Sequence, residues 1–223
     1  MIRYSNGCLE EYYHQIMTGE IIAGYELKDE LSKLMEEMHD VRYIYDTRDA
    51  DLRMDFMENC VRLTKSPFYG QPMKLMLWQK AFISAVYGFK MADDLTDRFR
   101  RILLLIARKN TKSETCSGLA LTELITGNDG SDIVCSSNDD NQANILYEAI
   151  NTMRLMIDPH QKDTWKNQQH IKCTFNGSKV FKLSDRTRNK EGRNIDFAIV
   201  DEVHEMKDNV IIKSIEQSQS LKP

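Results

Sequence analysis

A basic loop that could hold phosphate groups follows an apolar run at residues 101–107. The run predicts a buried strand, and the loop after it ends in Lys112 and Ser113. At a strand-to-helix junction, a lysine can bind the β- and γ-phosphates of a nucleotide while a serine hydroxyl binds magnesium. We therefore expect Lys112 to bind phosphate and act in catalysis, and Ser113 to be a magnesium ligand.

Two adjacent carboxylates end a second apolar run. Residues 196–201 predict another buried strand, with Asp201 at its end and Glu202 directly after it. Two acids at a buried strand end are costly without a cation partner, although a surface turn with incidental acids is the alternative. We expect Asp201 to bind magnesium and Glu202 to activate the water that attacks the γ-phosphate. ATP hydrolysis is thus the leading hypothesis.

The basic loop departs from the usual phosphate-binding pattern G-x-x-x-x-G-K-[ST]. Ile106 and Thr111 stand where the two glycines are expected. Glycine is used at such positions because the loop turns tightly and its N–H groups must approach phosphate oxygens. Thr111 in a left-handed conformation would cost about 1–2 kcal/mol. A solvated basic turn is therefore the alternative interpretation of the loop.

Further candidates lie in the loop and upstream of it. Arg108 could fold back on the γ-phosphate and stabilise charge during transfer, or could simply keep a strand end soluble. Lys109 and Asn110, with Thr111, complete the expected nucleotide-binding loop. Upstream, the Gln79 side chain offers the donor and the acceptor needed to read an adenine edge.

The bulk composition bounds the class of protein. A chain of 223 residues with 41% hydrophobic and 29% charged residues fits an α/β domain with a substantial core. The net charge of −4 gives no independent case for nucleic acid. Five scattered cysteines without a CxxC pair favour reduced thiols over a zinc site. Apolar runs are too short for a membrane span, and residues 1–20 lack a signal peptide, so we expect a cytoplasmic protein.

The pattern of apolar residues divides the chain in two. Residues 1–66 predict a wholly helical subdomain, because apolar positions from Leu27 to Tyr45 recur at spacings of three and four. Residues 67–223 predict the nucleotide-binding core, which begins with a Pro/Gly linker and a helix at 74–89. Strands are then expected at 101–107, 132–137, 179–184 and 196–201, and helices at 112–125, 139–156 and from 207. This alternation predicts an α/β fold with a mostly parallel sheet flanked by helices.

Three stretches together resemble the ATPase domain of the large terminase subunit of tailed bacteriophages, a P-loop NTPase of the ASCE type. They are Leu77-Trp78-Gln79, Ala107-Arg108-Lys109-Asn110-Thr111-Lys112-Ser113 and Phe197-Ala198-Ile199-Val200-Asp201-Glu202-Val203-His204-Glu205. The family loop usually reads A-R-K-N-G-K-S, so Thr111 in place of glycine is the main departure. The resemblance spans nearly the whole chain.

The resemblance implies a motor that hydrolyses ATP with Mg²⁺ to package double-stranded DNA into the procapsid in the host cytoplasm. It implies a homo-oligomeric ring docked on a portal protein, with a small terminase subunit selecting the DNA. An arginine from a neighbouring subunit often completes such a site, and Arg186, Arg188 and Arg193 are candidates, although they could equally be DNA contacts or a solvated loop. Family members continue into a nuclease domain, whereas this sequence ends at Pro223, so no nuclease activity is expected from these residues.

Two alternatives remain at this stage. One is a helicase-like ATPase core of the DEAD/DEAH type, which would also combine a glutamine motif, a phosphate loop and D-E-x-H. It is disfavoured because such helicases generally keep the loop glycines. The other is a catalytically degenerate module that binds nucleotide, which the missing glycines favour and the presence of Glu202 opposes.

Overall fold

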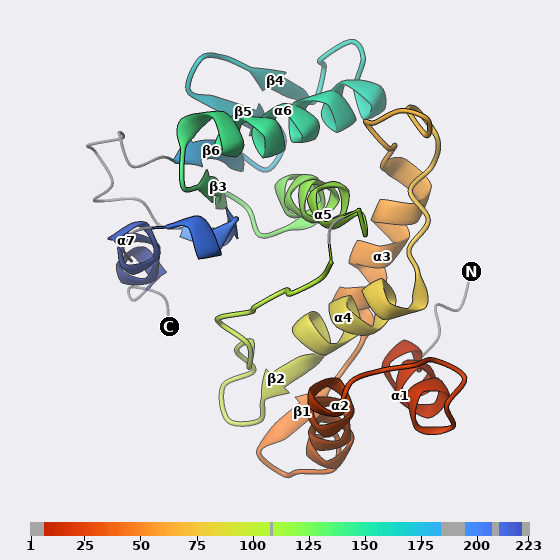
Figure 1. The fold of residues 1–223 in the computed structure, drawn as a ribbon. Coiled ribbons are helices and arrows are strands. Elements are labelled where there is room, and N and C mark those ends of the chain that lie inside the picture. Colours follow the sequence, from red (N-terminus) through yellow and green to blue (C-terminus); the bar gives the residue numbers. More distant parts are fainter. Residues whose placement is uncertain (1–6, 108, 184–194, 207–209, 220–223) are drawn as a thin grey trace. The chain divides into compact units, whose positions relative to one another are not determined.

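The computed structural model describes residues 7–107, 109–183, 195–206 and 210–219 (Figure 1). These residues form two compact units. The first comprises Met1–Asn59 and Lys74–Leu105, and the second comprises Cys60–Met73 and Ile106–Pro223. The chain therefore crosses between the units three times, and a domain boundary at residue 66 stays a prediction.

The first unit is mainly helical. It contains α1 (Cys8–Met17), α2 (Tyr25–Glu37), α3 (Arg48–Cys60) and α4 (Leu77–Gly88), together with an antiparallel pair formed by β1 (Tyr43–Tyr45) and β2 (Phe89–Met91). Its core gathers apolar residues from α1, α2, α4 and β2, namely Leu9, Ile16, Leu31, Leu34, Ala81 and Phe89. The helix expected at 74–89 is confirmed as α4.

The expectation that residues 1–66 are wholly helical is wrong. The helix that includes Leu27 ends at Glu37, and Val41, expected on its buried face, is 92% exposed. The chain turns here because the Asp40 carboxylate accepts hydrogen bonds from the backbone N–H and guanidinium of Arg42. Beyond this turn, Tyr43–Tyr45 pairs with a strand that is distant in sequence.

The second unit contains a five-stranded sheet in the order β4-β5-β6-β3-β7. β3 (Asp132–Ser137) pairs in parallel with β6 (Lys179–Leu183) on one side and with β7 (Ile195–Asp201) on the other. β4 (Thr164–Lys166) and β5 (His170–Cys173) extend the sheet by antiparallel pairing. The strands expected at 132–137, 179–184 and 196–201 are confirmed within a residue over the part described.

Helices cover both faces of this sheet. Cys135 and Lys182 are register partners, and Lys182 Nζ binds Asp140 and Asn144 of α6 (Asp140–Ile157), so their face lies under α6. α5 (Lys112–Thr126) contacts α6 (Figure 1). The opposite face, which carries Val134, packs against α7 (Val210–Gln219) through Ile211 and Ile215. The expected helices at 112–125 and 139–156 are thereby confirmed, the last expected helix is confirmed over Val210–Gln219, and the α/β fold is confirmed.

The expected strand at 101–107 is not formed. This segment has no regular structure, and its side chains Ile102, Leu103 and Leu105 are 47%, 80% and 87% exposed. A strand is stabilised by pairing with a neighbour, and none of the described strands pairs with this segment. The apolar residues of 101–107 therefore indicated a preference for burial, but the sequence pattern did not indicate whether a neighbouring strand would pair with them.

Candidate nucleotide site

The loop before α5 turns through left-handed backbone conformations. Lys109 has φ 67°, and Thr111, the N-cap of α5, has φ 60° and ψ 18°. Such values favour glycine, so Thr111 holds the conformation for which the usual loop has glycine. Two hydrogen bonds stabilise the turn: Asn110 Nδ2 donates to the Ala107 carbonyl oxygen, and Thr115 Oγ1 donates to the Thr111 carbonyl oxygen. The turn places Lys112 and Ser113 at the start of α5, where backbone N–H groups and the helix dipole favour an anion.

Lys112 bridges the two acids that follow β7. Its Nζ lies 2.8 Å from Asp201 Oδ1 and 2.9 Å from Glu202 Oε1. Partial burial alone would lower the pKa of Lys112, but the hydrogen bonds and charges of Asp201 and Glu202 outweigh it and raise the pKa. The phosphate-loop lysine and both acids, 89 and 90 residues apart in sequence, thus form one cluster.

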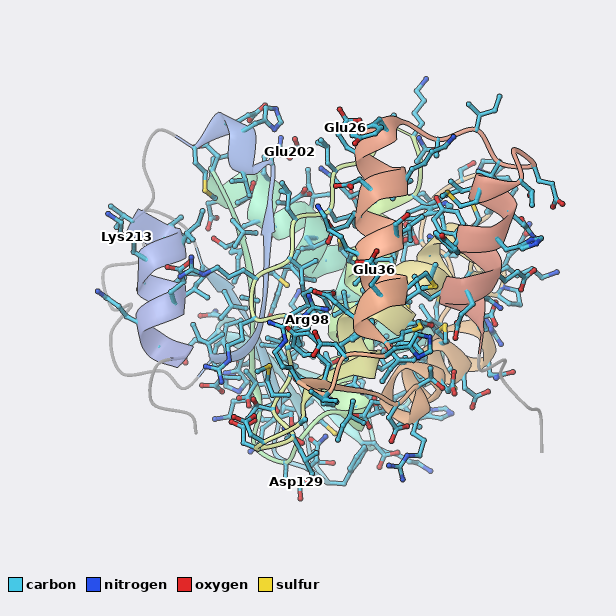
Figure 2. All side chains as sticks on the ribbon, turned by 90° about the horizontal axis from the view of Figure 1, so that it is seen from below. Glu26, Glu36, Arg98, Asp129, Glu202 and Lys213 are labelled. Carbon is cyan, nitrogen blue, oxygen red and sulfur yellow. The ribbon has the colours of Figure 1, made fainter. Side chains whose placement is uncertain are left out.

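The sheet positions the two acids. Asp201 is the register partner of Ser137 in the neighbouring strand β3, and Ser137 Oγ donates to the Asp201 carbonyl oxygen over 3.1 Å. The Asp201 carboxylate accepts from the backbone N–H of Glu202. Glu202 then adopts φ 52° and ψ 44°, so the chain leaves the strand sharply and the Glu202 side chain turns to the loop (Figure 2). His204 Nδ1 lies 3.4 Å from Glu202 Oε2, which makes His204 a neighbour of the acid.

Sequence reasoning missed a buried carboxylate beside the loop. Glu114, in the first turn of α5, is 8% exposed and accepts two hydrogen bonds from Thr64. The Thr64 backbone N–H lies 3.0 Å from Glu114 Oε2, and Thr64 Oγ1 lies 2.5 Å from Glu114 Oε1. The segment Cys60–Met73 is thereby attached to the helix that begins at Lys112. A glutamate next to Lys-Ser was visible in the sequence, but its partner 50 residues away was not.

The structure does not test the roles of the other predicted site residues. Gln79 belongs to the first compact unit, where its Oε1 accepts from the Met76 backbone N–H as part of a capping box for α4. Arg108 lies outside the described residues, and so do the three arginines proposed to act in a neighbouring site, Arg186, Arg188 and Arg193. Lys109 is exposed on the loop. The adenine-binding role of Gln79 and the phosphate-binding roles of Arg108 and Lys109 stay predictions.

The two predicted magnesium ligands, Ser113 and Asp201, stay predictions. Ser113 and Asp201 offer hydroxyl and carboxylate oxygens, which Mg²⁺ prefers. A cation, the Lys112 ammonium, already lies against Asp201, so the position favours positive charge. Over the described residues, no group of three or more His, Cys, Asp or Glu side chains could hold a metal ion. Magnesium here would thus take many of its ligands from water and nucleotide phosphates, as it commonly does.

Comparison with known proteins places this sequence in a family. Residues 77–223 match the family model described as the terminase large subunit, ATPase domain, over more than half of the chain. The chain belongs to the terminase large subunit ATPase domain family. The matched region begins at α4 and includes both the loop and the acid pair, so the resemblance in the sequence is confirmed.

A solved structure supports the fold of this terminase ATPase domain. The large terminase of bacteriophage HK97 superimposes with a TM-score of 0.66 at 24% identity, over 78% of this chain and 36% of that chain. The chain therefore spans about a third of the length of that large terminase. The large terminase ATPase domain of Thermus phage P74-26 is similar over 50% of this chain and 51% of that chain, with 24% identity and a TM-score of 0.42. Comparison with curated protein sequences gives no match.

Proposed function

We propose that this chain hydrolyses ATP to drive the packaging of double-stranded DNA into a phage procapsid. The observation that carries the proposal is the contact of Lys112 with both Asp201 and Glu202, because it brings the phosphate loop and the acid pair into one site. Membership of the terminase family supports the same reaction. The family match therefore favours a terminase motor over the alternative of a helicase-like ATPase core of the DEAD/DEAH type.

The roles of the side chains follow from their positions. Lys112 and the backbone N–H groups at the start of α5 would bind the β- and γ-phosphates. Ser113 and Asp201 would hold magnesium, which neutralises charge on the transferred phosphoryl group. Glu202, released from Lys112 when the lysine turns to phosphate, would accept a proton from the attacking water. Arg108 would stabilise the charge that develops on transfer.

The assembly implied by this role is part of the proposal. We infer a homo-oligomeric ring on a portal protein, with a small terminase subunit as a second partner, in the cytoplasm of the host cell. One of the arginines in the segment after β6 would act on the site of the neighbouring subunit, with candidates Arg186, Arg188 and Arg193. Among the described helices, none is long and apolar enough to cross a membrane.

The test is steady-state ATP turnover with magnesium, with and without linear double-stranded DNA. Glu202→Gln should abolish turnover while ATP binding survives, because glutamine cannot accept the proton from water. Glu205→Gln is the matched control, since Glu205 lies in the same turn but makes no contact with Lys112 in the described structure. ATP binding without any turnover in the wild-type protein would instead support the degenerate nucleotide-binding module.

A further inference from the structure

The antiparallel edge of the sheet carries an unusual excess of positive charge. Strands β4, β5 and β6 have the sequences TWK, HIKC and KVFKL, which contain four lysines and no aspartate or glutamate. Because side chains alternate between the faces of a sheet, these lysines divide between two surfaces with different surroundings.

On one face, the lysines have acidic partners. Lys166 Nζ binds Glu148 of α6, and Lys182 Nζ binds Asp140 of the same helix. The same face is otherwise apolar and buried, through Ile171, Cys173 and Val180. Both lysines on this face are thus neutralised within the second unit.

The opposite face carries lysines without such partners. Lys172 is the direct register partner of Trp165 on one side and of Lys179 on the other, so these three residues form one row across the strands. Like charges directly opposite each other in a sheet destabilise the pair. The row continues to Asp132 of β3, which is the register partner of Lys179 on its other side. Throughout the described residues, however, no carboxylate forms an ion pair with Lys172 or Lys179 at hydrogen-bond distance, so both ammonium groups keep the capacity to bind a phosphate. An anion bound across the two lysines would add to the offset that Asp132 supplies beside Lys179.

Aromatic rings flank the lysines on this face. His170 and Phe181 are register partners in the next row, and the rings of Trp165, His170 and Phe181 follow one another with centroid distances of 5.3 and 5.6 Å. Successive rings are tilted by 56° and 55°, so they pack on each other and do not present parallel faces for stacked bases. Trp165, 36% exposed, remains available to contact an apolar surface such as a sugar.

We propose that this face, which comprises Trp165, His170, Lys172, Lys179 and Phe181, binds double-stranded DNA through its phosphates. The adjacent ammonium groups of Lys172 and Lys179 match a polyanion, and contact with phosphates alone is independent of base sequence, as a packaging substrate requires. The tilted rings favour a duplex over a single strand, which binds by stacking its bases on open ring faces. The inference rests on the proposed packaging function for its biological meaning, but binding can be measured without ATP.

The experiment measures the affinity of the full chain for a labelled linear duplex by fluorescence anisotropy, over a series of monovalent salt concentrations without magnesium. Lys172→Gln/Lys179→Gln removes two phosphate contacts, which should lower the slope of log affinity against log salt by about 1.8 and weaken binding about 60-fold at 0.1 M salt. Lys166→Gln/Lys182→Gln is the matched control, with the same charge change on the opposite face of the same strands. We expect its affinity within about twofold of wild type, since its lysines are already paired.

Four results would contradict the proposal that this face binds duplex DNA. These results are failure of the wild-type chain to bind the duplex, an unchanged salt slope in Lys172→Gln/Lys179→Gln, an equal loss in the control, and preferential displacement by single-stranded DNA. ATP turnover without DNA separates the two proposals. If turnover is absent while duplex binding depends on Lys172 and Lys179, the proposed function fails and the surface stands; if turnover is normal while binding ignores them, the surface alone fails.

Discussion

The hydrogen bonds between Thr64 and Glu114 predict a measurable coupling between two segments that are far apart in sequence. Thr64→Val removes the hydroxyl donor to Glu114 and keeps the shape of the side chain and the backbone N–H. Glu114→Gln keeps the shape of the acceptor and removes its charge. Both residues lie in the second compact unit, so the perturbation stays within one body.

The magnitude follows from the charge of the acceptor. A hydrogen bond to a charged group contributes about 1.5–3 kcal/mol to the free energy of unfolding, and one between neutral groups about 0.5–1.5 kcal/mol. We therefore expect Thr64→Val to cost about 1.5–3 kcal/mol beside Glu114 but only about 0.5–1.5 kcal/mol beside Gln. The difference, about 1 kcal/mol, is the expected coupling energy of the double-mutant cycle.

Urea denaturation followed by tryptophan fluorescence provides the assay. Trp165 lies in the second unit and Trp78 in the first, so a Trp78→Phe background makes the signal specific to the unit that contains Thr64 and Glu114. Free energies that add to within about 0.3–0.5 kcal/mol would mean the two side chains do not interact, and the reasoning would be refuted. Thr64→Ser is the control, because it retains the hydroxyl donor.

Two further predictions concern the nucleotide site. Thr111→Gly should leave ATP affinity intact or improve it, and should raise the free energy of unfolding by up to about 1.5 kcal/mol. The substitution relieves about 1–2 kcal/mol of left-handed backbone strain, which outweighs the cost of about 0.4–1 kcal/mol from the added entropy of the unfolded chain. A collapse in ATP affinity, measured by calorimetry, would show that the Thr111 side chain contributes contacts. Burial, with a smaller contribution from the charge of Asp201, raises the pKa of the Cys116 thiol to about 12. At pH 8 the thiol of this half-buried residue should therefore resist iodoacetamide in the native protein and react in urea, as followed by mass spectrometry. Rapid labelling of the native protein would contradict the raised pKa.

The strands that the sequence predicted are those whose own apolar residues mark them as buried. The strands that it missed are those that form only by pairing with another segment. β3 and β7 contain apolar runs that are mostly buried in β3 and half-buried in β7, so the composition alone marked them. β4 and β5 alternate Trp, Lys and His with buried residues over only three and four positions, which is too short for a clear period. β1 and β2 pair across 43 intervening residues, and no local pattern specifies such a partner.

The same distinction holds for the site. Lys112, Asp201 and Glu202 could be grouped from sequence, because a lysine at a helix start and acids at a strand end converge at one edge of an α/β sheet. The contact between Glu114 and Thr64 could not be predicted, since no sequence pattern in either segment indicates its partner. The prediction of a buried strand that includes Ile102 and Leu105 was wrong, because none of the described strands pairs with this segment.

The salt bridges of Lys112 have a consequence for how nucleotide and metal would bind relative to one another. One ammonium shared by two carboxylates leaves the cluster one negative charge in excess. When the lysine swings to a phosphate, that excess becomes two, the charge that a divalent cation cancels. Nucleotide without metal would leave the carboxylates of Asp201 and Glu202 without a neutralising cation. Metal without nucleotide would compete with the Lys112 ammonium, which already contacts both carboxylates. If the proposed roles hold, the cluster should therefore bind nucleotide and metal together more readily than either ligand alone.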